Sequence, residues 1–383
     1  MAPVAAHGIR AGSLFGAKIG DLGLKMSLIL GIESSCDETA VAVVEDGDRV
    51  VSSEVASQIA VHAVHGGVVP ELAAREHLKA LDPVLSAALA KAGATLRDIS
   101  AVAVTQGPGL IPALLVGLSF AKGLAAGNKL PLIGVNHFFA HIYGAFLDGG
   151  RDKLARSDTY PLLALVVSGG HTSLLLVSAD GSARQLGCTI DDAAGEALDK
   201  GAKLLGLGYP GGPAIQKAAA GGNPEAFDFP RPLTGAAGKA LSDENRYNFS
   251  FSGIKTSLLY KLRDLTGGGA GALPPETLSD IAASYQYAVV DVLVRKAMAA
   301  AKAFKVRTLV AAGGVACNAE LRRVLAERLP KGVELLIAPP KYCTDNAAMV
   351  GGCGWHNFRR KEFSPLDIDA FARLPVISRV PFV

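Results

Sequence analysis

The sequence is poor in cysteine and in charge, and each shortage narrows what the chain can be. Its five cysteines form no CxxC pair and are odd in number, so a disulfide framework is not expected and a reducing, cytoplasmic setting is predicted. Charged residues make up only 19% of the chain and the net charge is +3, so bulk electrostatics do not demand a nucleic-acid partner. The pattern GxxxxGK[ST] is absent from the sequence, which excludes a P-loop.

The sequence also lacks an uninterrupted apolar segment long enough to cross a membrane. Residues 100–121 carry no charge, but Gln106, a Gly-Pro-Gly run at 107–109 and Pro112 interrupt them. These residues indicate a strand, a tight turn and then a helix, so no membrane span is predicted. Residues 1–25 show no apolar core followed by a small-residue cleavage site, and we interpret them as a disordered extension.

What the sequence does contain is an alternation of apolar strands and helices. A length of 383 residues favours two domains. Apolar runs at 28–32 and 40–44 flank a short polar turn, and the runs at 163–167 and 173–177 repeat this arrangement. We interpret them as a duplicated β-hairpin that opens each half of an α/β fold, with a domain boundary in the polar stretch 149–158.

Three turns of small residues lie between strands or before helices, at residues 34–39, 167–172 and 313–318. Glycine lets backbone amides approach a phosphate, and the N-terminus of a helix stabilises its charge. Any one of these turns alone is more often a plain structural turn. Three of them in a duplicated chain favour a nucleotide site in a cleft between the two halves.

The clearest chemical pattern is a pair of histidines, His137 and His141, four residues apart in a predicted helix. Residues at this spacing share one helix face, so both imidazoles can reach one metal ion. The simpler alternative is one core and one surface histidine. Asp345, in a loop before a small-residue helix, can supply a third ligand, and two histidines with one carboxylate suit iron or zinc. Phe138 stands where the HExxH pattern of zinc proteases has its glutamate, which argues against proteolysis.

Acidic residues beside the glycine turns are further candidates for the site. Asp37 and Glu38 lie in the first turn. Asp199 precedes a Tyr-Pro-Gly-Gly turn at residues 209–212, where a backbone can approach a ligand closely, so we predict that Asp199 binds a ligand.

Other conspicuous polar residues receive a structural interpretation. Asp191, Asp192 and Glu196 belong to a segment with helical spacing, and a solvated face or a helix cap explains them. Cys36 and Cys317 lie inside the turns without a visible paired base, so we interpret them as small buried residues rather than nucleophiles.

Taken together, these motifs resemble the TsaD family, the universal enzymes of tRNA threonylcarbamoyladenosine synthesis. The resemblance runs in order from about residue 26 to the end of the chain, and its motifs are highly specific. They lie at residues 31–39, 66–77, 105–123, 136–141, 165–172, 191–212, 248–256, 312–318 and 342–347.

The resemblance implies a two-lobed actin/Hsp70/sugar-kinase fold with duplicated domains. The N-terminal lobe would span residues 26–155 and carry the histidine pair, and the C-terminal lobe would span 156–338 and carry the substrate turns. Residues 339–383 would return to the N-terminal lobe. The implied reaction moves the threonylcarbamoyl group of L-threonylcarbamoyladenylate to the exocyclic amine of adenosine 37 in tRNAs that read codons beginning with adenine.

The resemblance also assigns residues to roles. It implies that His137, His141 and Asp345 hold one divalent metal ion per subunit, iron, with zinc as the alternative. Independently of the resemblance, the place of Asp37 and Glu38 beside the predicted phosphate turns leads us to predict that they position the acceptor or take its proton. The implied substrate contacts are Val166, Val167, Ser168, Gly169, Gly170, Asp199, Gly212 and Asn318.

One departure and three partners complete what the resemblance implies. Some relatives carry an aspartate where this chain has Gln216, which puts one hydrogen bond to the substrate in doubt. The implied partners are the tRNA anticodon loop, a paralogous TsaB-like scaffold protein and a small TsaE-like ATPase, with no membrane.

Residues 359–361, Arg-Arg-Lys, form a candidate local basic patch. A metalloendopeptidase and a non-catalytic scaffold paralogue remain as alternatives.

Overall fold

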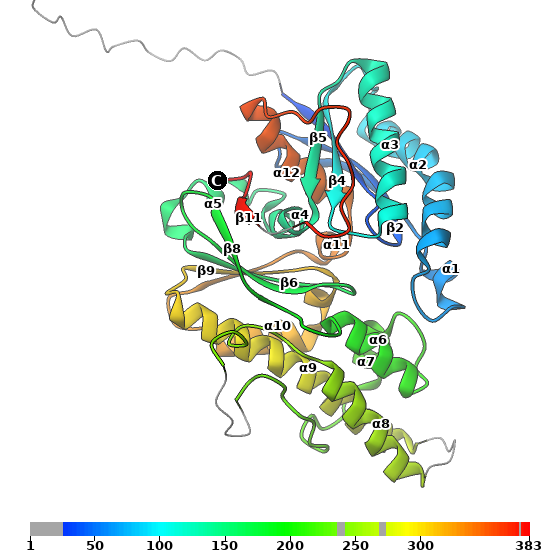
Figure 1. The fold of residues 1–383 in the computed structure, drawn as a ribbon, viewed down its shortest axis with the longest axis vertical. Coiled ribbons are helices and arrows are strands. Elements are labelled where there is room, and N and C mark those ends of the chain that lie inside the picture. The colour runs from blue at the N-terminus through cyan, green and yellow to red at the C-terminus, as the bar shows by residue number, and fades with distance from the viewer. Residues whose placement is uncertain (1–25, 236–241, 268–272, 375–376) are drawn as a thin grey trace, which may run out of the picture.

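The computed structural model describes residues 26–235, 242–267, 273–374 and 377–383, and these form two lobes (Figure 1). Each lobe is built around one β-sheet with helices packed on it. The extension expected at residues 1–25 lies outside the described residues.

The first sheet has five strands in the order β3-β2-β1-β4-β5. β1 runs antiparallel to β2 and parallel to β4, and β4 runs parallel to β5. β1 and β4 are almost entirely buried, as expected for central strands that read as continuous aliphatic runs. The strands are β1 (Leu28–Glu33), β2 (Glu38–Glu45), β3 (Arg49–Ser57), β4 (Ile99–Gly107) and β5 (Leu132–Asn136).

The second sheet has six strands in the order β10-β9-β6-β7-β8-β11, and its first five repeat the topology of the first sheet. β6 is the counterpart of β1, because it is antiparallel to β7 and parallel to β9. This matching order confirms the predicted duplication. The strands are β6 (Leu162–Val167), β7 (Thr172–Val177), β8 (Ser182–Cys188), β9 (Thr308–Ala312), β10 (Glu334–Ile337) and β11 (Ile377–Arg379).

Helices cover both faces of the first sheet. Side chains of α2 and α3 pack on one face, and those of α12 pack on the other. The long helix α9 lies along the outer side of the second lobe (Figure 1). The α-helices are α1 (Ile59–Ala63), α2 (Pro70–Ala92), α3 (Ile111–Asn128), α4 (His137–Tyr143), α5 (Arg151–Leu154), α6 (Ala194–Leu204), α7 (Gly211–Ala218), α8 (Ser252–Thr266), α9 (Pro275–Ala303), α10 (Ala319–Arg328), α11 (Pro340–Cys343) and α12 (Ala347–Arg360). Short 3₁₀ turns lie at η1 (Gly144–Phe146), η2 (Ser157–Thr159) and η3 (Gly314–Cys317).

The apolar stretch at residues 100–121 is a strand, a turn and a helix, as the sequence predicted. Within the described ranges, α3 is one helix whose length and composition alone would allow a membrane crossing. Its buried side chains, among them Leu114 and Leu118, pack against the first sheet and α2. That packing gives α3 the role of a core helix.

The two lobes share part of their hydrophobic core. One buried cluster joins Ile29 and Ala103 of the first sheet to Ala164 and Val310 of the second, through Phe139 of α4. Helix α4 therefore lies between the two sheets (Figure 1).

The C-terminal part of the chain touches both lobes. α12 packs on β1, β2 and β4 of the first sheet, whereas β11 pairs with β8 in the second. The contact between α12 and β1 is close because Gly31 has no side chain: a Cβ at Gly31 would overlap the carbonyl oxygen of Ala347. This close approach fixes the start of α12, and with it Asp345, beside the end of β1.

We expect Gly31→Ala to destabilise the chain by about 1–3 kcal/mol, because the added methyl group overpacks a rigid backbone contact. The matched control is Gly123→Ala in α3, where nothing lies within 4 Å of the added methyl group. Alanine favours a helix over glycine by about 0.8–1 kcal/mol, so the control should be as stable as the parent or more stable. Urea unfolding followed by circular dichroism measures both, and equal stabilities would contradict the prediction.

Candidate metal centre and interlobe cleft

The histidine pair lies at the start of α4, directly after β5. Asn136 caps this helix: its side-chain oxygen accepts hydrogen bonds from the backbone N–H groups of Phe138 and Phe139, at 2.9 and 3.3 Å. The cap fixes the first turn, so His137 and His141 lie one turn apart on the same face. Both imidazoles are buried.

Asp345 joins the two histidines from the loop before α12. Its Oδ1 lies 3.1 Å from His141 Nε2 and 3.5 Å from His137 Nε2, and the two Nε2 atoms lie 3.1 Å apart. Asn346 caps α12 by accepting a hydrogen bond from Met349 N at 3.0 Å, which holds the neighbouring Asp345 in place. The structure thus brings the three residues expected to bind metal together.

The chemistry of these three groups fits a divalent cation. Ligand-to-metal distances of about 2.0–2.2 Å place neighbouring ligand atoms roughly 3.0–3.5 Å apart, and the three atoms have this spacing. His141 Nδ1 is buried without a hydrogen-bond partner in the structure, so the hydrogen bond of this ring is formed on the Nε2 side alone. Three protein ligands leave further coordination positions for a substrate or water.

The charges in this cluster are strongly coupled. Burial lowers the pKa of His137, but the carboxylates of Glu33 and Asp345 outweigh it and raise that pKa to about 9. Burial and the charge of His137 lower the pKa of His141. Burial opposes ionisation of Asp345, yet the two histidines hold its pKa well below the ordinary value. When no metal ion is present, the His137 ring is therefore protonated, and its positive charge is balanced by the carboxylates of Glu33 and Asp345.

Glu33 is a site residue that the sequence analysis missed. Its Oε2 lies 3.0 Å from His137 Nδ1, and its carboxylate is fully buried. Burial raises the pKa of Glu33, but the charge of His137 and its hydrogen bond lower it overall. The available signal was a lone acidic residue at the end of the aliphatic strand 28–32, where a buried carboxylate needs a partner.

Asp37 lies on the first lobe in the turn between β1 and β2, and Glu38 is the first residue of β2. Burial raises the pKa of Glu38 to about 8, even though Ser57 donates a hydrogen bond to its Oε1 at 2.9 Å. Its other oxygen, Oε2, is buried without a partner in the structure. Burial also raises the pKa of Asp37, and the charge of Asp345 adds to both increases. These two carboxyl groups therefore belong to the electrostatic surroundings of the metal cluster.

The turn after β6 faces the first lobe from the other side. The side chains of Val166 and Val167 are fully buried in two different core clusters, so only their backbone can meet a ligand. Ser168, Gly169 and Gly170 form the turn itself, and a Cβ built on either glycine would meet nothing within 4 Å. This open backbone is the kind of surface that a phosphate can approach.

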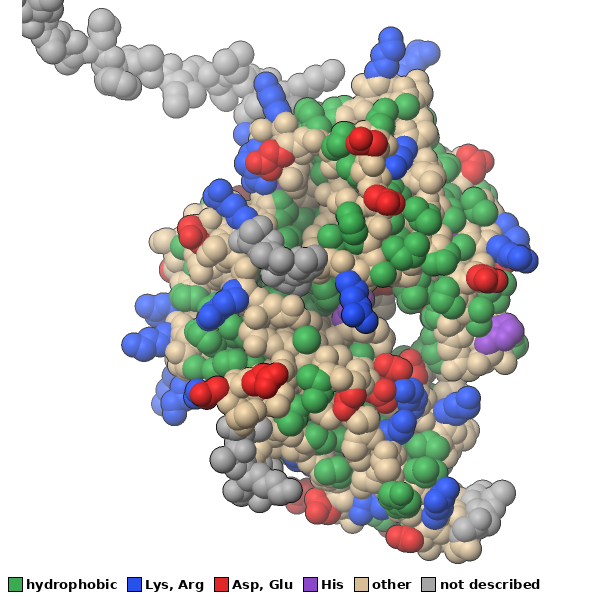
Figure 2. Space-filling model, in the orientation of Figure 1, with side chains coloured by type: hydrophobic (Ala, Val, Ile, Leu, Met, Phe, Trp, Pro, Cys, Tyr) green, Lys and Arg blue, Asp and Glu red, His purple; other side chains and the backbone are tan. Residues whose placement is uncertain are grey.

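Asp199 and Gly212 lie on the second lobe, where α6 and α7 meet. Asp199 Oδ1 accepts a hydrogen bond from Gly211 N at 2.7 Å, which fixes the turn that contains Gly212. Burial raises the pKa of Asp199, and the charge of Asp37 on the opposite lobe adds to the increase. Figure 2 shows open space between the lobes, with acidic side chains at its edge. The structure therefore brings Asp37 and Asp199 towards the same interlobe cleft.

The side-chain amide of Asn318, which was expected to contact substrate, is already hydrogen-bonded within the protein at both its oxygen and its nitrogen. Its Oδ1 caps α10 by accepting from Leu321 N at 3.0 Å, and its Nδ2 donates to Gln286 Oε1 at 2.8 Å. The side chain of Gln216 reaches the same place, where its Oε1 accepts from Ala319 N at 2.8 Å. Gln216 thus supports the glycine turn that precedes α10.

The structural interpretation of the acidic segment is confirmed. Asp191 accepts hydrogen bonds from the backbone N–H groups of Phe251 and Ser252, at 2.8 and 3.4 Å, and so caps α8. Asp192 pairs with Lys200, and Glu196 accepts from the backbone at the start of α6.

The cysteines need a correction, because Cys36 and Cys317 are half-buried rather than buried. Burial raises the pKa of Cys36 well above its ordinary value, so this thiol is not a nucleophile. The pKa of Cys317 is lowered to about 7, first by a hydrogen bond with the Cys343 thiol and further by Arg322. Cys317 therefore has more thiolate character than its sequence context suggested.

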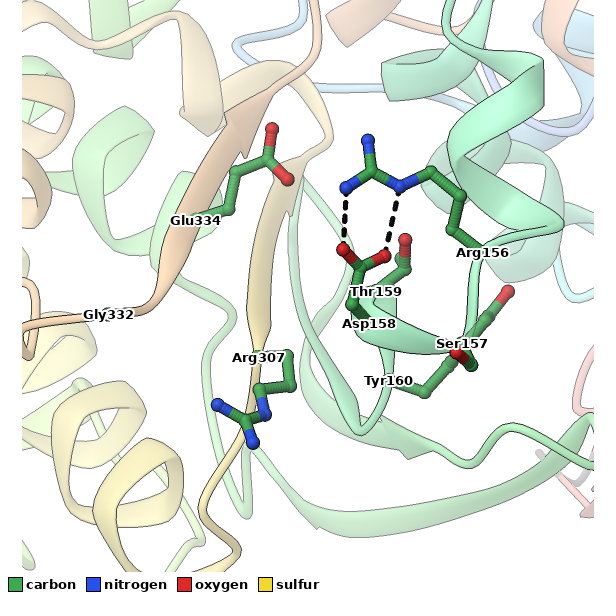
Figure 3. Close-up of a pocket in the computed structure, with 8 residues that line it drawn as sticks. All are labelled: Arg156, Ser157, Asp158, Thr159, Tyr160, Arg307, Gly332 and Glu334. Carbon is green, nitrogen blue, oxygen red and sulfur yellow. Dashed lines mark hydrogen bonds and ion pairs between the residues drawn. The ribbon is translucent and has the colours of Figure 1, made fainter.

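A separate polar cavity of about 560 Å³ lies away from these residues. Two of its lining residues, Arg156 and Asp158, are joined by two hydrogen bonds of 2.9 and 2.6 Å (Figure 3). This cavity opens at the beginnings of β6 and β9, whereas the expected site residues follow their ends. Ligands of such sheets bind beyond the carboxyl ends of the strands, so the cavity is not the candidate site. Its lining residues are Arg156, Ser157, Asp158, Thr159, Tyr160, Arg307, Gly332 and Glu334.

Comparison with solved structures confirms the predicted fold. An activator of the 2-hydroxyisocaproyl-CoA dehydratase from Clostridium difficile with bound ADPNP is 16% identical, with a TM-score of 0.50 over 88% of this chain and 98% of that chain. T. kodakarensis HypF is 14% identical, with a TM-score of 0.55 over 89% of this chain and 49% of that chain. Likenesses at this level of identity show the fold alone, which is the predicted two-lobed actin/Hsp70/sugar-kinase class.

Sequence comparison identifies the family. The family model for TsaD, described as tRNA N6-adenosine threonylcarbamoyltransferase, matches residues 49–352. A protein of that name from Geotalea uraniireducens is 51% identical over 352 residues, or 92% of this chain and 97% of the relative. Another from Syntrophotalea carbinolica is 49% identical over 350 residues, or 91% of this chain and 97% of the relative. The chain belongs to the TsaD family and is an enzyme of the transferase class.

Proposed function

We propose that the chain transfers the threonylcarbamoyl group of L-threonylcarbamoyladenylate to N6 of adenosine 37 in tRNAs that read codons beginning with adenine. The observation that carries this proposal is the convergence of His137, His141 and Asp345 to within 3.1–3.5 Å at the cleft between the lobes. Membership in the TsaD family supports the reaction class, and the cleft geometry supports the choice of donor.

The donor is an activated acyl group, so the protein has to orient it rather than attack it. We assign the phosphate of the donor to the turn of Ser168, Gly169 and Gly170, with Val166 and Val167 contributing main-chain atoms only. The open backbone is that of the two glycines, because Ser168 N already donates to His171 O at 2.8 Å. Asp199, Gly212 and Asn318 are assigned to the rest of the adenylate. Holding both reactants in one geometry supplies much of the rate acceleration in such a transfer.

We propose that His137, His141 and Asp345 hold one divalent ion, iron, with zinc as the alternative. Two histidines and one carboxylate with open positions form the ligand set typical of mononuclear Fe(II) sites. When bound, such an ion supplies a Lewis acid that polarises an oxygen atom of the donor.

Glu38 is the proposed proton acceptor, with Asp37 positioning the adenosine beside it. In the transfer, the N6 nitrogen forms a bond to the carbamoyl carbon, and the bond between that carbon and the AMP oxygen breaks. AMP leaves with the electron pair, and the proton of N6 goes to Glu38. A carboxyl group with a pKa of about 8 is close to neutral pH, which suits a general base.

Binding of the tRNA requires a protein surface outside the interlobe cleft. Bases of an anticodon loop are reachable because the loop is single-stranded, and recognition there combines stacking with phosphate contacts. Because the net charge is only +3, we propose that TsaB-like and TsaE-like partners supply part of the affinity for tRNA. Residues 359–361, at the C-terminal end of α12, are a local contribution. The proposed setting is the cytoplasm, without a membrane.

The two alternatives fit the site less well. A metalloendopeptidase of the HExxH type needs a glutamate beside its first histidine, and Phe138 holds that position with its side chain buried. A scaffold paralogue has no use for three converging ligand groups, which are costly to bury unless they act together.

The direct test uses the full chain, loaded with Fe²⁺, together with its TsaB-like and TsaE-like partners. The mixture receives L-threonylcarbamoyladenylate and unmodified tRNA, and the digested nucleosides are analysed by mass spectrometry. We expect threonylcarbamoyladenosine to appear at position 37 and AMP to be released in equal amount. Unchanged tRNA with all components present, or transfer that proceeds without this chain, would overturn the proposal.

A further inference from the structure

Glu33 occupies an unusual position at the end of β1, where a fully buried carboxylate has every oxygen engaged. Oε1 accepts a hydrogen bond from Ser35 N at 2.6 Å. Oε2 accepts one from the Thr105 hydroxyl at 2.6 Å and lies 3.0 Å from His137 Nδ1. None of its surface is exposed, so it cannot touch a substrate.

We propose that Glu33 is a positioning residue of the metal centre that does not itself coordinate the ion. Its carboxylate holds His137 in the tautomer that presents Nε2 to the ion, and it supplies the second negative charge that balances a buried divalent cation. This inference rests on the proposed metal site and names the residue that prepares the site for its ion.

The tautomer follows from the chemistry of the partners. A carboxylate only accepts hydrogen bonds, so the proton between Glu33 and His137 belongs to Nδ1. The lone pair of a neutral His137 is then on Nε2, the atom that faces His141 and Asp345 at 3.1 and 3.5 Å. Partners of this kind orient metal-binding histidines and raise their basicity.

The two histidines are not equivalent in this respect. Among the described residues, His141 Nδ1 is buried without a hydrogen-bond partner, so none of them fixes the tautomer of this ring through Nδ1. His137 is therefore the ligand whose orientation the protein fixes. Its Nδ1 lies 3.0 Å from Glu33 Oε2 and, at a longer distance, 3.5 Å from the Ser35 hydroxyl. Thr105 of β4 and Ser35, in the turn after β1, fix the carboxylate of Glu33 in turn, so these two segments support the metal ligand through Glu33.

The charge balance points to the same residue. Two neutral imidazoles and the carboxylate of Asp345 leave a divalent ion with one uncompensated positive charge. The negative charge of Glu33 balances that positive charge from the other side of the His137 ring. The balance matters because a buried charge without a counter-charge is costly in free energy. A neutral side chain at position 33 would leave the loaded centre with a buried net charge, so the ion would bind less tightly.

The test compares zinc binding by the full-length chain and two isosteric variants, by competition with a chromophoric chelator. Glu33→Gln keeps the shape and removes the charge, and we expect its affinity for Zn²⁺ to fall by about 10- to 100-fold. Thr105→Val removes one hydrogen bond to Glu33 but keeps the carboxylate on His137, so its affinity should change by roughly 3-fold or less. Thermal melts of the metal-free proteins check that all three are folded. Unchanged affinity in Glu33→Gln would overturn the proposal.

Two further measurements keep the outcomes distinct. If His141→Ala binds Zn²⁺ as tightly as the parent chain, the metal site itself is wrong and the role of Glu33 fails with it. Should Glu33→Gln not fold, ¹⁵N spectra of the histidines in the zinc-loaded parent chain decide the matter. We expect a protonated Nδ1 and a metal-bound Nε2 on His137, and binding through Nδ1 would overturn the proposal.

Discussion

A His141→Ala chain should fold, bind almost no metal and leave tRNA unmodified. The imidazole of His141 lies 3.1 Å from both other ligand atoms, so its loss removes one of three ligands and opens the cluster. Two remaining ligands bind a divalent ion far more weakly than three, and a transfer that needs a polarised donor loses its Lewis acid. In a strain that carries only this variant, threonylcarbamoyladenosine should fall to about 1% of the parental level or below, because removal of a catalytic group slows a reaction by about 100-fold or more.

The control for this variant is His65→Ala. His65 is exposed on the loop after α1 and belongs to no ligand cluster found among the described residues. Its loss should leave both metal content and the modified nucleoside near parental levels. Metal content is measured by elemental analysis of the purified proteins, and circular dichroism checks the fold. A His141→Ala chain that lacks metal but still modifies tRNA would show that the reaction does not need the ion.

A Glu38→Gln chain should bind the donor but transfer it about 100- to 10,000-fold more slowly, the range expected when a general base is lost. The parent chain should also show a characteristic pH dependence. Glu38 is protonated below its pKa of about 8 and ionised above it, and only the ionised form accepts the proton of N6. The rate constant of transfer should therefore rise as pH increases through about 8, and this rise should be missing from Glu38→Gln.

Ser57→Ala provides the matched control for the pH profile. The Ser57 hydroxyl donates to Glu38 Oε1 at 2.9 Å, and this hydrogen bond lowers the pKa of Glu38. Removing it should move the rise in rate to higher pH while the limiting rate stays within a few-fold. Single-turnover transfer at saturating donor, measured from pH 6 to 9.5, gives all three profiles. An unshifted profile in Ser57→Ala, or an unchanged rise in Glu38→Gln, would exclude Glu38 as the base.

Local spacing was enough to place the two histidines, because four residues along a helix correspond to about one turn whatever the rest of the chain does. Asp345 could be named only through the resemblance and the composition of its loop. Its position depends on the packing of α12 against β1, where Gly31 admits the carbonyl of Ala347. That contact joins two segments that are far apart in the sequence, and it leaves no periodic pattern from which it could be predicted.

Other features were hidden for the same physical reason. Glu33 looks like the polar end of a strand, and only the three-dimensional neighbours Thr105 and His137 show that it is enclosed. The sequence also could not show that Val166 and Val167 turn their side chains into separate cores. Motifs mark which segments matter, whereas burial and hydrogen bonding decide which atoms of a segment are free to act.

The shared core around α4 has a mechanical consequence. Because Phe139 and its apolar neighbours bind both sheets to this helix, the lobes cannot separate there without exposing a close-packed interior. A relative movement of the lobes would therefore have to keep this contact closed. His137 and His141 lie on this same helix, so the residues proposed to hold the ion stand where the two lobes are joined.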